Sequence, residues 1–244
     1  MTFISPIFNK INIQNIQFRA NSSPVTYPAG QNLRKDSFNS NPLYDNFVDK
    51  NKLTQLAKSN PDVMRILKEN KIPLKINVKE LEDLKNGHLM DTRITAAKMY
   101  SALPKDLKSQ VNLMDLQQAA MLHDYGKVLI PEKILNKNAR LTPEENEIMH
   151  LHSRLSEEIL STQNIEPEVL NIVKYHHQNK QGTGYPAMKN ASRGYDINTE
   201  IVSLADKYSA LTEKRAYKPE MSQEKALSIL KTQVEEGHVN PRVY

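Results

Sequence analysis

Apolar residues recur at helical spacing along most of the chain from about residue 43 onward. Between Met90 and Leu103, for example, they return every three or four residues, which places them on one face of a helix. No segment shows the strict alternation of a half-buried strand, and no internal repeat is evident. The pattern predicts an all-α bundle. The expected helices span residues 43–57, 61–69, 77–86, 90–103, 115–124, 143–160, 167–177, 199–214 and 223–236.

Capping residues and helix breakers mark several of these boundaries. Asn60 is expected to be an N-cap, followed by Pro61 at the first helical position. Gly87 and Pro104 are typical of helix ends. The stretch that begins at Thr142 reads Thr-Pro-Glu-Glu, which predicts a capping box. The segment 115–124 is apolar on all sides, so we expect its helix to be central.

Residues 1–42 differ from the rest of the chain. They are rich in Asn, Gln, Ser and Pro, and no helical or alternating period persists. This composition predicts a disordered tail, either a plain linker or, as the minority alternative, a docking peptide. We expect a helical N-terminal extension over 43–86 and the main domain over 87–244.

Charge and composition exclude several classes of protein. The formal net charge is +5, but three of these charges lie in residues 1–42, so we expect no DNA partner. No cysteine is present, which excludes disulfides and thiolate metal sites and fits a cytoplasmic location. No apolar run approaches the ~20 residues of a membrane span, and the N-terminus lacks the features of a secretion signal.

The segment 119–127 carries the most distinctive chemistry. Four apolar residues lead into His123-Asp124, Gly126 then allows a sharp turn, and Lys127 follows. A buried imidazole and carboxylate are costly unless something satisfies them, and a metal ion would do so. An isolated His-Asp pair is more often a capping Asp beside a hydrogen-bonded core His. Lys127 favours a functional site, because it can point back at an anionic substrate.

Further candidate ligands lie on later helices. His150 and His152 are two residues apart and cannot share a helix face, and the apolar neighbours of His152 favour it. His176 and His177 are adjacent at a helix end. Asp206 lies on an apolar face, where a metal or a lysine could satisfy it. Imidazoles and carboxylates that converge from separate helices are typical of di-metal sites in bundles, and this donor set suits Fe, Mn or Zn. We expect His88 to be an ordinary surface residue.

Together these motifs resemble the HD superfamily of metal-dependent phosphohydrolases, and more closely its HD-GYP branch. The resemblance covers roughly Gly87 to the C-terminus. His123-Asp124-x-Gly126-Lys127 resembles the HD-x-GK signature, and His176-His177 followed by Gly184-Tyr185-Pro186 resembles the HH and GYP signatures. Asp206, followed by the stretch with Arg215 and Lys218, resembles the closing ligand and the substrate-binding segment.

The resemblance implies an HD-domain helical bundle with two divalent metals per chain, iron or manganese first and zinc as the alternative. By resemblance, Asp124 bridges the metals and Lys127 contacts the scissile phosphate. The partner implied is a cyclic dinucleotide, cyclic di-GMP first, or another phosphorylated small molecule, and a homodimer is conceivable. The resemblance also implies the remaining roles: one metal held by His152, His176 and His177, the other by His123 and Asp206, and nucleotide contacts from Gly184, Tyr185, Arg215 and Lys218.

The chain departs from the family pattern in places. The family has a Glu and a His on the helix before the HD pair, where this chain has Asn86 and Met90; His88 is nearby and could substitute after a shift in the helix start. Gln178 and Gln181 occupy positions that are usually acidic. The chain also stops where a further family helix is expected to begin.

These departures leave three functions open. The first is a phosphodiesterase acting on cyclic di-GMP. The second is a catalytically degenerate module that binds nucleotide or metal without turnover. The third is an HD-type phosphohydrolase acting on another phosphorylated nucleotide.

Overall fold

The structure is a computed structural model that describes residues 49–77, 79–80, 83, 87–188, 195–213 and 220–244. The regular elements in these ranges are all helical, which confirms the predicted all-α class. The elements are α2 (Lys50–Ser59), α3 (Pro61–Glu69), α5 (His88–Ala102), α6 (Lys105–Lys108), α7 (Leu113–Leu122), the 3₁₀ helix η3 (Tyr125–Leu129), α8 (Glu132–Leu135), α9 (Pro143–Ser161), α10 (Pro167–Tyr175), α12 (Ile197–Thr212) and α13 (Gln223–Glu235).

The predicted caps are present. The Asn60 side chain accepts hydrogen bonds from the first-turn amides at residues 62 and 63, at 2.9 and 3.1 Å. Thr142 and Glu145 form both halves of the capping box at the start of α9. Because each cap satisfies amides that have no partner inside the helix, these local sequences are sufficient to place the helix starts.

Other boundaries differ from those expected. α5 begins at His88, two residues before Met90, and α7 ends at Leu122, so that His123 and Asp124 lie just beyond the helix. The short elements α6, η3 and α8 were not predicted, because four or five residues are too few to show a period. The tail over 1–42 and most of the helix expected over 77–86 fall outside the described residues.

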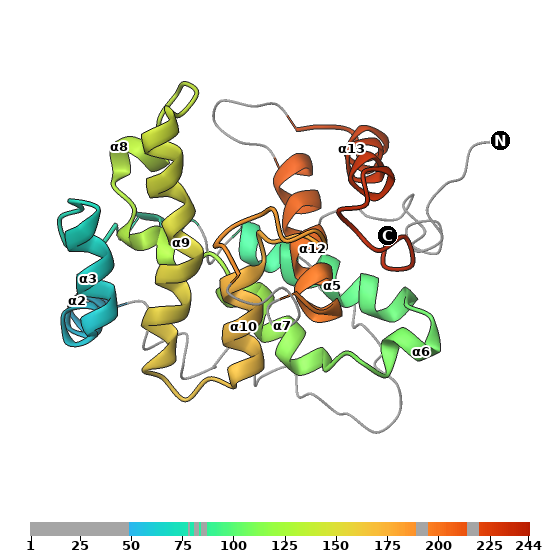
Figure 1. The fold of residues 1–244 in the computed structure, drawn as a ribbon, viewed down its shortest axis with the longest axis horizontal. Coiled ribbons are helices and arrows are strands. Elements are labelled where there is room, and N and C mark those ends of the chain that lie inside the picture. The colour runs from blue at the N-terminus through green and yellow to red at the C-terminus, as the bar shows by residue number, and fades with distance from the viewer. Residues whose placement is uncertain (1–48, 78, 81–82, 84–86, 189–194, 214–219) are drawn as a thin grey trace.

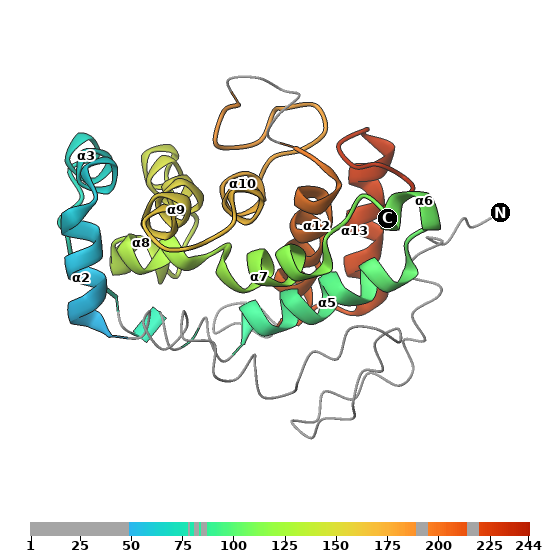
Figure 2. The same cartoon turned by 90° about the horizontal axis from the view of Figure 1, so that it is seen from below.

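The helices form a row crossed by two others. Figure 2 shows α3, α9, α10, α12 and α13 following one another across the molecule, with α5 and α7 running beneath α10 and α12. Consistent with this view, α5 packs on α7 and α12, α10 on α7, α9 and α12, and α13 on α12. The segment after α7 packs on α9, and α2 and α3 lie at the far end of the row (Figure 1).

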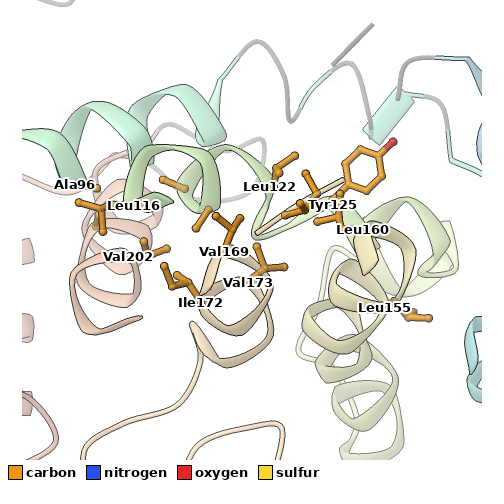
Figure 3. Packing of buried hydrophobic residues seen from close by; sticks show 14 of the residues in the cluster. Ala96, Leu116, Leu122, Tyr125, Leu155, Leu160, Val169, Ile172, Val173 and Val202 are labelled. Carbon is orange, nitrogen blue, oxygen red and sulfur yellow. The ribbon is translucent and has the colours of Figure 1, made fainter. Parts of the chain in front are cut away.

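A continuous apolar core joins these helices. Figure 3 shows Ala96, Leu116 and Val202 where α5, α7 and α12 meet, and Val169 and Val173 of α10 beside them. All five are fully buried. The carboxyl ends of α7 and α10 are thereby fixed beside α9 and α12, which brings the candidate site together. Across the described residues, no helix combines the length and the apolar character that crossing a bilayer would require.

Candidate metal centre

Imidazole and carboxylate groups from five segments converge inside the bundle. The segments are the start of α5, the end of α7, the middle of α9, the end of α10 and the middle of α12. The converging residues are His88, His123, Asp124, His152, His176, His177 and Asp206. Six of the seven are buried, and His177 keeps 20% of its side chain exposed. The structure therefore brings together all six sequence-predicted ligands, and it adds His88.

The first group consists of Asp124 with three histidines from α9 and the end of α10. One ligand atom from each of the four lies within 4.8 Å of the others, so the group could hold a metal ion. Nε2 of His152 lies 3.1 Å from Nε2 of His177 and 3.5 Å from Nε2 of His176. Oδ1 of Asp124 lies 3.3 Å from the same His152 nitrogen.

Backbone hydrogen bonds fix the tautomers of three of these rings. Nδ1 of His123, His152 and His176 lies 2.7–2.9 Å from the carbonyl oxygen three residues earlier in each case. A carbonyl can only accept, so each Nδ1 carries a proton and each Nε2 faces the centre; the neutral rings of His152 and His176 present a lone pair there. Facing lone pairs repel one another, and a cation between them converts the repulsion into coordination.

The second group shares Asp124 with the first and adds His88, His123 and Asp206. Nε2 of His88 lies 2.9 Å from Oδ1 of Asp206. Nε2 of His123 and Oδ1 of Asp124 are buried and have no hydrogen-bond partner. Buried polar atoms without partners are rare in folded proteins, so these two are aimed at a site for a ligand.

His88 corrects an expectation from the sequence. It was expected on the surface, but it is 6% exposed and lies within the second group. α5 begins at His88, directly after Gly87, so its side chain leaves the first turn toward Asp206. Met90 carries a thioether, which is a poor ligand for iron, manganese or zinc, and Asn86 lies outside the described residues. The signal that could have found His88 was the glycine before it, which allows the helix to start there.

The charges within the site are arranged in opposing pairs. Burial opposes ionisation of Asp124, but Lys127, His123 and His152 together hold its pKa well below the ordinary value. Nζ of Lys127 lies 2.6 Å from Oδ2 of Asp124. Burial also opposes a charge on His123, yet the adjacent carboxylates of Asp124 and Asp206 raise its pKa to about 10.

At His152, His176 and His177 burial is the largest effect and outweighs the nearby carboxylates. It lowers the pKa of His152 to about 4 and the pKa of His176 to about 3. The pKa of His177 also falls well below its ordinary value, first through burial and then through the neighbouring imidazoles. These three imidazoles are therefore neutral near pH 7, which is the form that binds metals.

The turn after the His-Asp pair packs directly against α9. A Cβ added to Gly126 would lie 2.2 Å from the carbonyl oxygen of His152. Ser156 accepts a hydrogen bond from the Gly126 amide at 2.7 Å, and its hydroxyl lies 2.8 Å from the carbonyl oxygens of both His123 and His152. Gly126 and Ser156 thus hold the two histidine-bearing segments in register, a role that the sequence alone did not reveal for Ser156.

A second close contact fixes the Gly-Tyr-Pro segment. A Cβ added to Gly184 would lie 2.1 Å from the carbonyl oxygen of His177. The buried Gln178 side chain accepts from the Gly184 amide at 3.1 Å and donates to the Pro186 carbonyl at 2.6 Å. A carboxylate could not donate in this way, so the glutamine at this usually acidic position clamps the loop. Gln181 similarly donates to the Glu236 carbonyl.

The ring of Tyr185 lies next to the first group. It stacks on His177 with ring centroids 4.6 Å apart, and it stacks on His150 with centroids 3.8 Å apart. Gly184, Tyr185 and Lys127 are therefore beside the candidate metal ligands, as expected for residues that meet a substrate. Arg215 and Lys218 lie outside the described residues.

Comparison with known proteins identifies the family. The HD domain family model matches residues 66–243, so the match begins within α3. Two curated cyclic di-GMP phosphodiesterases are similar to this chain. One, from Vibrio cholerae, is 37% identical over 122 residues, which is 47% of this chain and 25% of the relative. The other, from Thermotoga maritima, is 42% identical over 113 residues, which is 45% of this chain and 30% of the relative.

A solved structure shares the fold. An HDGYP protein from Bdellovibrio bacteriovorus matches with a TM-score of 0.51 at 16% identity, over 84% of this chain and 65% of that chain. The region that the family model matches, residues 66–243, includes the whole metal centre described above. The chain spans at most about a third of the two curated relatives. Its helical fold, its His-Asp turn and the family match together show that the chain belongs to the HD domain family.

Proposed function

We propose that this chain is a metal-dependent phosphodiesterase that hydrolyses cyclic dinucleotides, with cyclic di-GMP as the first candidate. The observation that carries the proposal is a pair of four-residue ligand groups that share Asp124. Two cation sites bridged by one carboxylate are suited to phosphate ester hydrolysis. The names of the similar Vibrio and Thermotoga proteins support this substrate class.

The two groups divide the ligands between two divalent cations, with iron or manganese first and zinc as the alternative. We assign His152, His176 and His177 to one cation, and His88, His123 and Asp206 to the other, with Asp124 shared. Nitrogen and oxygen donors without sulfur suit these metals. When bound, the cations supply a Lewis acid for the phosphate and a source of hydroxide at neutral pH.

The residues of the chain would position the substrate and balance its charge. The Lys127 side chain is 19% exposed and its ammonium lies against Asp124, so it is placed at the edge of the site to offset negative charge on the phosphoryl oxygens. The backbone at Gly184 is closely packed on the His177 carbonyl and would form a rigid surface for a ligand to contact. Tyr185, Arg215 and Lys218 complete the proposed nucleotide contacts.

The test combines metal analysis with turnover. Protein loaded with manganese or iron should contain two metal ions per chain and convert cyclic di-GMP to the linear dinucleotide or GMP. Asp124→Asn should lose both metals and turnover, whereas Asp106→Asn, which removes a surface carboxylate paired with Arg242, should lose neither. Absence of turnover on cyclic di-GMP at every metal loading would defeat the cyclic di-GMP assignment.

A degenerate binding module is the second candidate, and one observation favours it. Met90 stands in a slot where a family ligand is expected, and its thioether is a poor ligand for iron, manganese or zinc. Calorimetry separates the two functions, because a degenerate module would bind the dinucleotide tightly without releasing product. Turnover of a different phosphorylated nucleotide in a substrate screen would instead favour another HD-type phosphohydrolase.

A further inference from the structure

His150 is the one histidine of α9 that the candidate metal groups leave unused. It precedes the proposed ligand His152 by two residues and points to another side of the helix. Its ring is nevertheless close to the site, because it stacks on Tyr185 with centroids 3.8 Å apart and planes 14° from parallel. This is closer and more nearly parallel than the stack between Tyr185 and His177, at 4.6 Å and 29°.

The two histidines lie on opposite faces of the tyrosine. Rings stacked this closely on the same face of Tyr185 would also contact each other. His150 and His177, both within the described part of the chain, make no ring contact with one another. The Tyr185 ring is therefore held between His150 on one face and His177 on the other.

The backbone of Tyr185 is fixed as well. Its amide donates to the His177 carbonyl at 3.3 Å, and Gln178 clamps the residues on either side. Gly184 presses against the same carbonyl with no room for a Cβ. The backbone thus determines where the side chain begins, but the ring can still rotate about its two side-chain torsions. The imidazole of His150 restricts that rotation.

We propose that His150 is a positioning residue that holds the Tyr185 ring against His177, so that Tyr185 meets the nucleotide through its hydroxyl group and not through a ring face. This inference rests on the proposed function. With both faces covered by imidazoles, the ring offers a ligand only its edge. Aromatic residues that bind nucleobases by stacking need a free face, and Tyr185 has none.

Chemical modification tests the positioning without any substrate. Nitration by tetranitromethane, followed at the Tyr185 peptide by mass spectrometry, reports how accessible this one phenol ring is. His150→Ala should raise nitration at Tyr185 several-fold, and His150→Phe, which keeps a flat ring, should restore the wild-type rate. The matched control is Glu147→Ala, an exposed residue one turn earlier on α9. Equal nitration in wild type and His150→Ala would overturn the positioning role.

Dinucleotide affinity tests the hydroxyl contact. Tyr185→Phe keeps the ring and removes only the hydroxyl, so its affinity for cyclic di-GMP should fall roughly 3- to 10-fold, as for the loss of one hydrogen bond. His150→Ala should weaken binding by a similar factor, while His150→Phe and Glu147→Ala should match the wild type. Wild-type affinity in Tyr185→Phe together with weak binding in Tyr185→Ala would show a stacking platform and overturn the proposal.

The two measurements separate the failure of this inference from that of the proposed function. If wild-type protein binds no cyclic dinucleotide, the proposed function fails and the hydroxyl contact fails with it. The nitration result still decides whether His150 holds the ring. If the wild type is active and His150→Ala behaves like it in both assays, only the present inference fails.

Discussion

Nε2 of His88 lies 2.9 Å from Oδ1 of Asp206, although the two residues are 118 positions apart in the chain. The contact joins the first residue of α5 to the middle of α12, and it completes the second ligand group. His88 lies about one half-turn from positions 86 and 90, where the family resemblance leads us to expect a Glu and a His. The loss of family residues at Asn86 and Met90 therefore does not empty this group.

Substitution of His88 should change the metal content. We expect His88→Ala to reduce bound manganese from two ions per chain to one. Its group then keeps only three of its four ligands, whereas the other group is intact. The matched control is Met90→Ala, which alters a neighbouring residue of the same helix that belongs to neither group. Elemental analysis by mass spectrometry measures both. Two retained ions in His88→Ala would contradict the assignment of this residue.

Replacement of Lys127 should separate catalysis from metal binding. Lys127→Met removes the ammonium that we assign to the phosphate, so turnover of cyclic di-GMP should fall ~10²–10³-fold, as for the loss of one electrostatic contact to a transition state. The metal content should stay at two ions, since lysine is not a ligand. Lys137→Met, which removes a lysine paired with Glu145 on the surface, should keep full activity. Unchanged turnover in Lys127→Met would rule out the proposed role.

Loss of the Ser156 hydroxyl should destabilise the protein. Ser156→Ala leaves the buried Gly126 amide without an acceptor, which costs about 1–3 kcal/mol of unfolding free energy. Ser153→Ala is the matched control on α9, because its buried hydroxyl contacts only the His150 carbonyl of its own helix, at 3.4 Å. Urea denaturation of the metal-free proteins gives the comparison. Equal losses in the two variants would argue against a special role for Ser156.

The stability of the metal-free protein should fall as the pH drops below neutrality. Burial lowers the pKa of His152 to about 4 and the pKa of His176 to about 3. Below the ordinary value of 6.5 these histidines are therefore protonated in the unfolded chain while they stay neutral in the folded chain. Each histidine then removes about 1.4 kcal/mol of unfolding free energy per pH unit between about pH 6.5 and 4.

Other groups of the site do not offset this loss. The pKa of His123 is raised, so its contribution is fully present below about pH 6.5 and constant across the window. The pKa of Asp124 is lowered, so its contribution to stability is lost only at pH values below the ordinary aspartate pKa. Urea unfolding of chelator-treated protein at about pH 7, 6 and 5 measures the slope. A flat profile would show that these imidazoles are not buried in the neutral form.

Local sequence was sufficient for the longer helices and for most of the candidate ligands, but not for the short elements α6, η3 and α8. The cap at Asn60 and the capping box at Thr142 act within four residues, so the chain itself contains the information that starts α3 and α9. The choice of His152 over His150 followed from the apolar residues on its face, and the structure places His152 in the ligand group. Spacing alone could not show that His150 stacks on Tyr185, because that contact joins α9 to a distant loop.

Tertiary packing decided the rest of the site. Whether His88 reaches Asp206 depends on where α5 begins and on how it lies against α12, and neither is visible in the period of the sequence. The need for glycine at 126 arises from the carbonyl of His152, which is remote in sequence. Sequence periodicity determined which faces are buried, because burial follows from side-chain polarity. Only the assembled bundle determined which buried groups meet, because distances between helices depend on all of their contacts at once.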